Sequence, residues 1–264
     1  MQLTDRQEQI LTYLRDEGRV TVEGLSSDLD VTCQTIRRDL GELCALGLAA
    51  RVRGGARPLS PIANREYRER RLLHAPAKHQ IGRHVASLIP NSCSIMLNIG
   101  TTTERVANSL SQHKDLRVVT NNANIINILI RSAAHELILV GGSVRPSDGA
   151  ILGEDAIEFI SRYKAEYAVV GASALDPDGA ILDFDSREVS VARSILKNSR
   201  TRILACDSSK FEQIAPVRIC DIEEIDIMVT DKCPPREFTQ KADRGGTEII
   251  VTESYGDSDA ISSR

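Results

Sequence analysis

The stretch VTCQTIRRDL, residues 31–40, decides the fold of the first part of this chain. Thr32 can cap a helix, and an apolar stripe then recurs at helical spacing. The stripe consists of Ile36, Leu40 and Leu43. Gln34 and Arg38 fall close to the opposite face of the same helix. Because a Gln amide pairs with adenine and an Arg guanidinium pairs with guanine or a phosphate, the stretch predicts a helix that reads a DNA major groove.

Two shorter helices are predicted before this stretch. Residues 4–7, TDRQ, form a capping-box pattern, and apolar residues then recur at helical spacing up to residue 16. Thr21 can cap a second helix over residues 22–29, and residues 30–31 make the turn into the third helix, which ends near residue 46. Three helices joined by such short turns form a helix-turn-helix unit, which can contact DNA or another protein.

A short hairpin is predicted directly after the third helix. Residues 48–56, LAARVRGGA, follow a strand pattern with Arg51 and Arg53 on one face, and Gly54 and Gly55 supply a flexible turn. Such a hairpin is a wing, whose arginines can lie along the DNA backbone. The residues predicted to bind DNA are Thr32, Gln34, Thr35, Arg37, Arg38, Arg51 and Arg53.

The charge of the whole chain does not by itself indicate a nucleic-acid-binding protein. The 264 residues carry a net charge of −4, but residues 51–71 contain seven arginines and two glutamates. Such a cluster suits a phosphate backbone, although a solvated linker would look the same. A chain of this length with 41% hydrophobic residues can form two domains, each with its own core.

Four segments are predicted along the chain. They are a winged helix-turn-helix domain at residues 1–57, a linker rich in proline and arginine at 58–77, an α/β domain at 78–252 and a flexible tail at 253–264. The six cysteines form no CxxC pair and no zinc-ligand spacing, so no disulfide, metal or cofactor is expected. No signal pattern or apolar run of about 18 residues is present, which predicts a cytoplasmic protein outside the membrane.

From residue 78 onward, predicted helices alternate with short apolar strands. Strands are predicted at residues 94–99, 116–120, 136–140, 167–170, 202–206, 226–229 and 247–251. Helices are predicted at residues 78–88, 103–110, 125–131, 154–161 and 187–198, with a loop rich in Gly and Asp at 171–185. This alternation predicts an α/β fold with a parallel sheet covered by helices on both faces.

Small and polar residues follow the predicted strands at their carboxyl ends, where ligands bind in open α/β sheets. Gly100 precedes three threonines at the start of a helix, and a glycine turn with hydroxyls and free helix amides suits a phosphate. Lys210 adds a cation. Acceptors for hydroxyl groups come from Asp183, Asp185 and Glu188. A small phosphorylated polyol or sugar has both features. The residues predicted to bind it are Gly100, Thr101, Thr102, Thr103, Asn121, Asn122, Gly141, Gly142, Asp185, Glu188 and Lys210.

Each of these motifs taken alone also has an ordinary explanation. Threonines cap helices without any ligand, and Asn-Asn or Gly-Gly after a strand is common turn chemistry. A single lysine is commonly a solvated surface residue. Their shared position at predicted strand ends is what favours a binding site.

Taken together, these motifs resemble the DeoR family of bacterial transcriptional repressors over nearly the whole chain. The resemblance is carried by TIRRDL (35–40), RVRGGA (51–56), NIGTTT (98–103), TNN (120–122), VGGSVRPSDGAILGE (140–154) and DSSKF (207–211). It implies an N-terminal winged helix-turn-helix and a C-terminal sensor domain similar to ribose-5-phosphate isomerases, which responds to phosphorylated sugars. Residues 121–129, 145–160 and 178–200 look most like members that respond to glycerol 3-phosphate, so the resemblance makes sn-glycerol 3-phosphate the leading inducer.

The chain departs from the family pattern at two places. Arg53 occupies a wing position that is usually histidine, so a permanent charge replaces a titratable one. The isomerases carry an acidic motif after the fourth strand, whereas residues 170–173 here read VGAS. What remains resembles the binding half of the isomerase site, namely the threonine turn, Glu188 and Lys210, which favours binding without catalysis.

The favoured hypothesis is a repressor that leaves its double-stranded operator DNA when a phosphorylated polyol or sugar binds. A dimer or tetramer is expected, because operators present paired half-sites about one helical turn apart. The alternative is a sugar-phosphate isomerase-like enzyme with an accessory DNA-binding domain. An activator also stays open, because the sign of regulation depends on where the operator lies.

Overall fold

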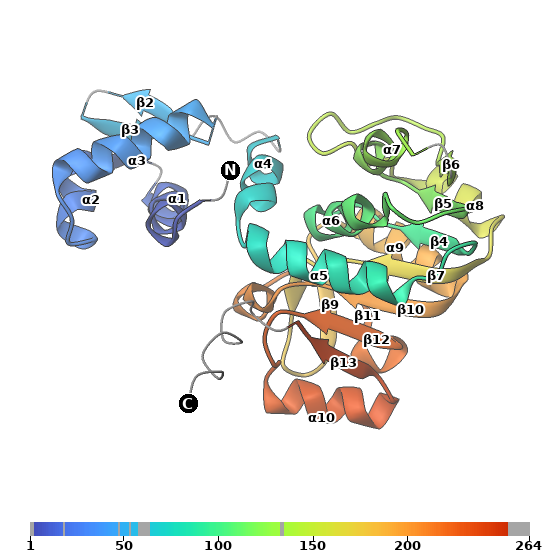
Figure 1. The fold of residues 1–264 in the computed structure, drawn as a ribbon. Helices are drawn as coiled ribbons and strands as arrows, with labels where there is room; N and C mark the ends of the chain where they lie inside the picture. Colours follow the sequence, from blue (N-terminus) through green and yellow to red (C-terminus); the bar gives the residue numbers. More distant parts are fainter. Residues whose placement is uncertain are drawn as a thin grey trace, which may run out of the picture. The chain divides into compact units, whose positions relative to one another are not determined.

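The computed structural model of the chain describes residues 3–17, 19–46, 48–52, 54–57, 64–132 and 135–252. The chain divides into two compact units, Met1–Ala75 and Pro76–Arg264. Figure 1 shows the helices and strands of both units. In the described part of the chain, no helix combines the length and the apolar character needed to cross a lipid bilayer.

The N-terminal unit contains a three-helix arrangement followed by a hairpin. Its helices are α1 (Asp5–Glu17), α2 (Val22–Asp28), α3 (Cys33–Ala45) and α4 (Asn64–Leu72), and its strands are β1 (Val20–Thr21), β2 (Ala50–Val52) and β3 (Gly55–Arg57). The strands form an antiparallel sheet in the order β1-β3-β2. The predicted helix-turn-helix and hairpin wing are confirmed. The two-residue strand β1 lies outside the prediction.

Threonine side chains begin the first three helices at the predicted positions. The Thr4 N–H donates to Gln7 Oε1 at 3.0 Å and the Gln7 N–H donates to Thr4 Oγ1 at 3.3 Å, which is a capping box. Thr21 and Thr32 each accept a hydrogen bond from the N–H three residues later, at 3.1 and 3.2 Å. Each such cap stabilises its helix by about 1 kcal/mol.

The apolar stripe of α3 is fully buried, as predicted. Ile36, Leu40 and Leu43 have no exposed surface, and they belong to one cluster with Ile10 and Leu14 of α1. Burial of each such side chain contributes roughly 1.5–3 kcal/mol. The outward face of α3 is therefore held on a rigid support.

The wing turns through two glycines that have different roles. Gly54 has a φ of +81°, in the left-handed region that favours glycine. A Cβ on Gly55 would lie 1.9 Å from the main-chain oxygen of Val20 in β1. Only glycine therefore allows β3 to approach β1 so closely.

The segment predicted as a linker, residues 58–77, contains helical structure. Residues 58–63 lie outside the described part of the chain, but α4 follows them and α5 begins at Ala75. Leu72 and Leu73 pack against the apolar cluster of the N-terminal unit. These two leucines are partly buried by residues distant in sequence, which a local pattern in the predicted linker does not show. The predicted tail at 253–264 lies outside the described residues.

The C-terminal unit combines a parallel sheet, flanking helices and a small antiparallel sheet. The parallel sheet contains β4 (Ser94–Leu97), β5 (Leu116–Thr120), β6 (His135–Leu139), β7 (Ala165–Val170), β10 (Ser199–Ala205), β12 (Ile227–Thr230) and β13 (Glu248–Val251). The helices are α5 (Ala75–Leu88), α6 (Thr101–Leu110), α7 (Ala123–Leu129), α8 (Glu154–Ser161), α9 (Ser186–Lys197) and α10 (Arg236–Gly245). The antiparallel sheet contains β8 (Ala174–Leu175), β9 (Ala180–Asp183) and β11 (Val217–Asp221).

Helices cover both faces of the parallel sheet, as predicted (Figure 1). Residues of α5, α6 and α7 belong to one buried cluster, and residues of α8, α9 and α10 belong to the other. β4 separates the two clusters, since Ile95 and Leu97 pack in the first and Met96 packs in the second. This strict alternation is the pattern of a strand that is buried on both faces.

The strand order places the point where the chain connections diverge between β4 and β7. The order is β13-β12-β10-β7-β4-β5-β6. From β4 the chain continues to β5 and β6 on one side, and it then returns to β7 on the other side of β4. Ligands of open α/β sheets bind at the carboxyl ends of strands where the connections diverge in this way. Gly100 and Gly171 follow the two strands at this point.

The prediction of an irregular loop over residues 171–185 is wrong. β8 and β9 form a hairpin there, and β9 pairs with β11, which was not predicted. The pairing joins Asp183 to Val217, so the strand partner is too distant in sequence for a local pattern to show it. The charged helix α10 was also missed, because it buries only Phe238 and Ala242 among its described residues.

Candidate functional sites

α3 presents polar side chains on the face opposite its buried stripe. The structure leaves Thr32, Gln34, Arg37 and Arg38 exposed and Thr35 half-buried. Arg51 is exposed on β2, and its Nη1 donates to the main-chain oxygen of Arg37 at 3.3 Å. The helix and the wing strand therefore bring these predicted DNA contacts together. Arg53 lies outside the described residues.

A polar network that sequence reasoning missed fixes α3 against α1. The Arg6 guanidinium donates to both carboxylate oxygens of Asp39, through Nε at 2.6 Å and Nη2 at 3.3 Å. Gln7 Nε2 donates to Glu42 Oε2 at 2.6 Å, and Arg38 Nε donates to Glu42 Oε1 at 3.1 Å. Arg38 and then Gln7 hold the pKa of Glu42 below its ordinary value. The Arg38 side chain is thus oriented along the helix surface.

This network borders a depression on the N-terminal unit. The lining includes Thr4, Arg6, Gln7, Gln34, Thr35, Arg37, Arg38, Asp39 and Glu42. Arg38 is 81% exposed, so a base or a phosphate can replace Glu42 as its partner at little cost. The one feature of the sequence that could have indicated this network is the spacing of four residues between Arg38 and Glu42, which lets the two side chains pair on a helix. The partner of Asp39 lies in another helix and could not be read locally.

The turn between β4 and α6 has the form expected of an anion site. Gly100 has a φ of +147° and is the N-cap of α6, which leaves N–H groups of the first turn without helical acceptors. Thr103 is fully buried, and its hydroxyl donates to the main-chain oxygens of Asn98 and Gly100 at 2.9 Å each. The hydroxyls of Thr101 and Thr102 bond to no described residue. Thr103 therefore shapes the turn, while Thr101 and Thr102 can contact a ligand.

The amide nitrogens of Asn121 and Asn122 donate within the protein, whereas Asn121 Oδ1 has no hydrogen-bond partner among the described residues. Both are almost fully buried. Asn121 Nδ2 donates to the main-chain oxygen of Ile151 at 3.1 Å. Asn122 Oδ1 accepts from the Asn124 N–H at 2.9 Å, and Asn122 Nδ2 lies 3.4 Å from Glu104 Oε1. These amides tie the end of β5 to the loop at 141–153 and to α6.

The remaining predicted ligand contacts lie at different strands. Gly141 and Gly142 are exposed after β6, which is two strands and hence about 10 Å from β4. Lys210 lies in the short helix Ser208–Glu212, after the β10 strand that neighbours β7. Its ammonium pairs with no carboxylate among the described residues. Lys210 thus follows the strand next to β7, whereas Gly141 and Gly142 follow the strand at the edge of the sheet.

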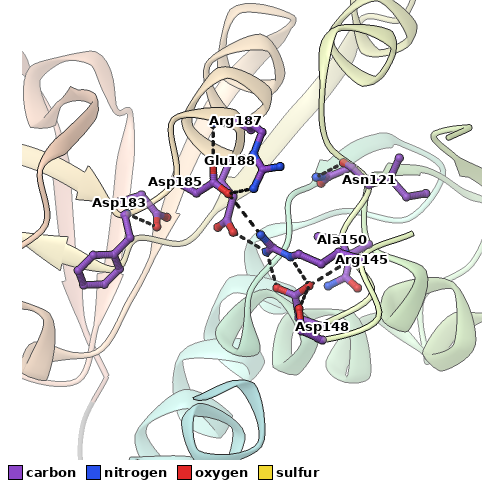
Figure 2. Close-up of polar contacts among 12 residues, drawn as sticks. Asn121, Arg145, Asp148, Ala150, Asp183, Asp185, Arg187 and Glu188 are labelled. Carbon is purple, nitrogen blue, oxygen red and sulfur yellow. Dashed lines mark hydrogen bonds and ion pairs between the residues drawn. The ribbon is translucent and has the colours of Figure 1, made fainter. Parts of the chain in front are cut away.

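Two predicted carboxylates lie in the first turn of α9 (Figure 2). Asp185 is the N-cap of the helix and accepts from the Arg187 N–H at 2.9 Å. The side chain of Arg187 holds the pKa of Asp185 below its ordinary value. Glu188 forms an ion pair with Arg145, a residue that the sequence analysis did not assign.

Arg145 is the centre of a charged cluster in the C-terminal unit (Figure 2). Its Nε and Nη2 donate to the two carboxylate oxygens of Asp148 at 2.9 and 2.6 Å, and its Nη1 lies 3.5 Å from Asp185 Oδ2. Hydrogen bonds that Arg145 donates to Asp148 and Glu188 raise the pKa of its guanidinium. Its sequence signal was a single arginine inside the stretch VGGSVRPSDGAILGE. Among the described residues, no group of three or more His, Cys, Asp or Glu side chains is placed to hold a metal ion.

Two family models match the two units. A DeoR-like helix-turn-helix domain matches residues 6–61, and a DeoR C terminal sensor domain matches residues 73–232. The chain belongs to the DeoR family. In this DeoR-family protein, the first match contains α3 and the wing, and the second contains Gly100, Arg145 and Lys210.

Curated relatives align with this DeoR-family protein along most of its length. The glycerol-3-phosphate regulon repressor of Haemophilus influenzae is 40% identical over 87% of this chain and 89% of that protein. The glycerol-3-phosphate regulon repressor of Escherichia coli is 40% identical over 91% of this chain and 95% of that protein. The HTH-type transcriptional repressor CsqR of Escherichia coli is 32% identical over 94% of this chain and 95% of that protein.

Solved structures overlap with this DeoR-family protein only in part. A D-ribose-5-phosphate isomerase in complex with phospho-erythronic acid aligns over 50% of this chain and 52% of that chain. The sequence identity is 16% and the TM-score is 0.37.

Proposed function

We propose that this protein is a DNA-binding transcriptional repressor that leaves its operator when a phosphorylated polyol or sugar binds its sensor domain. The observation that carries the proposal is the exposed Gln34, Arg37 and Arg38 face of α3 above a fully buried stripe. This face lies inside a DeoR-like helix-turn-helix domain. Relatives with repressor names favour repression over activation.

The DNA contacts divide into base reading and backbone contact. We assign Gln34 and Arg38 to base edges, because a side-chain amide suits adenine and a guanidinium suits guanine. Arg51 on the wing is placed to contact a phosphate. A homodimer or homotetramer would present two such helices to paired half-sites.

The effector site divides into an anion half and a hydroxyl half. The Gly100 turn, Thr101 and Thr102 offer N–H and O–H donors at a helix N-terminus, and Lys210 offers a cation after β10, two strands from β4. Asp185 and Glu188 offer acceptors for hydroxyl groups. Two relatives are glycerol-3-phosphate regulon repressors, so we favour sn-glycerol 3-phosphate among phosphorylated polyols.

The residues after β7 are consistent with a domain that binds a sugar phosphate without converting it. The strand continues into Gly171, Ala172 and Ser173, none of which carries a carboxylate that could move a proton. The alternative, an isomerase-like enzyme with an accessory DNA-binding domain, predicts conversion of ribose 5-phosphate by the purified protein. The repressor proposal predicts none.

Fluorescence anisotropy of a labelled DNA fragment from upstream of the protein's own gene tests the proposal. The expected result is binding of the protein, followed by release on addition of sn-glycerol 3-phosphate but not of glycerol. Binding without release by any phosphorylated polyol would contradict the sensing role. Failure to bind the fragment or other candidate operators would contradict the DNA-binding role.

Two kinds of variant separate the domains in this assay. Arg38→Ala should weaken operator binding by about 10- to 100-fold, because one bidentate base contact is worth roughly 1–3 kcal/mol, and should leave effector affinity unchanged. Thr102→Val and Lys210→Ala should bind the operator normally and resist release. A Thr102→Val protein that is released like the wild type would remove this hydroxyl from the site.

A further inference from the structure

The main chain around Arg145 is fixed to the end of a central strand. The Arg145 N–H donates to the Ala150 oxygen at 2.8 Å, and the Gly149 N–H donates back to the Arg145 oxygen at 2.9 Å, which closes a tight turn. The Ile151 N–H donates to the Asn121 oxygen at 2.8 Å. Arg145 therefore starts from a defined position beside the carboxyl end of β5.

The side chain of Arg145 reaches from this turn to another element (Figure 2). One side of the guanidinium is held by both carboxylate oxygens of Asp148 in its own turn. The other side contacts Asp185 and Glu188 at the start of α9. Because a guanidinium has a rigid fork of five N–H donors, it can bridge the loop and the helix at once.

The same series of hydrogen bonds continues to the anion half of the site. The main-chain oxygen of Asp148 accepts from Asn124 Nδ2 at 2.8 Å. That amide also donates to Glu104 Oε1 at 3.1 Å. Glu104 follows the threonine turn in α6. A continuous polar series thus runs from the first turn of α6, through Asn124, Asp148 and Arg145, to the first turn of α9.

We propose that Arg145 is a positioning residue that determines effector specificity. It holds the α9 carboxylates at a set distance from the Gly100 turn, so that the domain prefers a phosphorylated polyol of matching length over a bare phosphate. This inference rests on the proposed function, since it needs an anion at the Gly100 turn and hydroxyl groups at Asp185 and Glu188. Arg145 acts through these carboxylates, because its guanidinium is already occupied by three of them.

Isothermal titration calorimetry of the full-length protein tests this inference with sn-glycerol 3-phosphate and inorganic phosphate as ligands. Arg145→Met should weaken binding of sn-glycerol 3-phosphate by about 10-fold or more, as expected for loss of a residue that orients a ligand-binding group. Its affinity for inorganic phosphate should stay close to that of the wild type. Arg145→Lys, which keeps the charge but not the fork, should lie between the two proteins.

Arg187→Met is the matched control. Arg187 also donates to Asp185, with Nη2 at 2.7 Å from Oδ2, but it belongs to α9 itself and does not join the helix to the loop. In Arg187→Met, the ratio of the affinity for sn-glycerol 3-phosphate to the affinity for inorganic phosphate should therefore stay as in the wild type. If Arg145→Met fails to fold, Asp148→Asn is the substitute, because it weakens the contact between the loop and Arg145. It should lower the affinity for sn-glycerol 3-phosphate relative to that for inorganic phosphate.

The outcomes separate this inference from the proposed function. Equal weakening of both ligands in Arg145→Met would overturn a positioning role and assign Arg145 to the anion itself. Unchanged affinity for both would remove Arg145 from the site. A wild-type protein that binds no phosphorylated polyol would instead refute the proposed effector, and the inference with it.

Discussion

Asp185 lies between two arginines at the start of α9. The side chain of Arg187 donates to it at 3.1 and 2.7 Å, and Arg145 Nη1 lies 3.5 Å away. These contacts, with that of Arg187 the largest, lower the pKa of Asp185 in the folded protein. The unfolded chain therefore binds this proton more tightly than the folded protein does, and the Asp185 charge stabilises the fold wherever it is ionised.

Asp185→Asn should make stability less dependent on pH in the acid range. The contribution of Asp185 is present above the pKa of the unfolded carboxyl, about 3.9, and is lost as the pH falls through the lower pKa of the folded state. Asparagine keeps the helix cap but carries no charge. Urea unfolding between pH 6 and about 2.5 should show a steeper loss of stability in the wild type than in the variant below about pH 4. Parallel curves would contradict this assignment.

Neighbouring residues of the same type have different hydrogen-bonding roles at the carboxyl ends of the strands. Thr101, Thr102 and Thr103 form one run, yet only the third is wholly consumed by internal hydrogen bonds. Asn121 and Asn122, which are also predicted to bind the ligand, donate their amide nitrogens to groups around them, whereas the buried Asn121 Oδ1 has no hydrogen-bond partner among the described residues. The sequence identified the turn. Only the folded structure decides which of its polar side chains form internal hydrogen bonds and which can still bond to a ligand.

At the scale of elements, the wing is built on a close approach between strands. β3 pairs with both β1 and β2, so it is the central strand of the small sheet. Gly55 lies opposite Thr21 and Val52 in the two neighbouring strands. A side chain there would collide with the main chain of β1 rather than with a movable side chain.

Gly55→Ala should destabilise the wing, because its Cβ would lie 1.9 Å from the Val20 oxygen. The expected loss is about 1–3 kcal/mol in the free energy of unfolding, together with weaker operator binding. Gly54→Asn is the control, since nothing lies within 4 Å of a Cβ at Gly54 and asparagine tolerates its positive φ. Urea denaturation measures both variants. Equal stability of Gly55→Ala and the wild type would rule out the close approach.

At the scale of the whole molecule, charge is distributed unevenly along an acidic chain. The net charge is −4, whereas residues 1–75 contain twelve arginines and eleven acidic residues and are close to neutral. Some of these acidic residues are paired with arginines, as Asp39 is with Arg6. The proposed attraction to DNA therefore rests on local arginines of α3 and the wing rather than on the net charge.

The salt dependence of operator binding should show whether the arginines of the wing contact DNA phosphates. Arg51→Ala should reduce the slope of log affinity against log salt concentration by about one for each protomer bound, as expected for one phosphate contact. Arg117→Ala removes the same charge from the sensor unit, where Arg117 is exposed and paired with Glu136, and should leave the slope unchanged. Anisotropy titrations at several salt concentrations give both slopes. A slope that changes equally in both variants would contradict a local wing contact.

The sequence by itself determined the helix-turn-helix, its three caps, the wing and the parallel sheet. These features depend on residues a few positions apart, such as Thr32 with Thr35 or Ile36 with Leu40, so periodicity and capping patterns reveal them. Only the tertiary structure decided the contacts between distant residues. Pairs such as Arg6 with Asp39, Arg145 with Glu188 and β9 with β11 leave no periodic trace, because chain folding alone brings their members together.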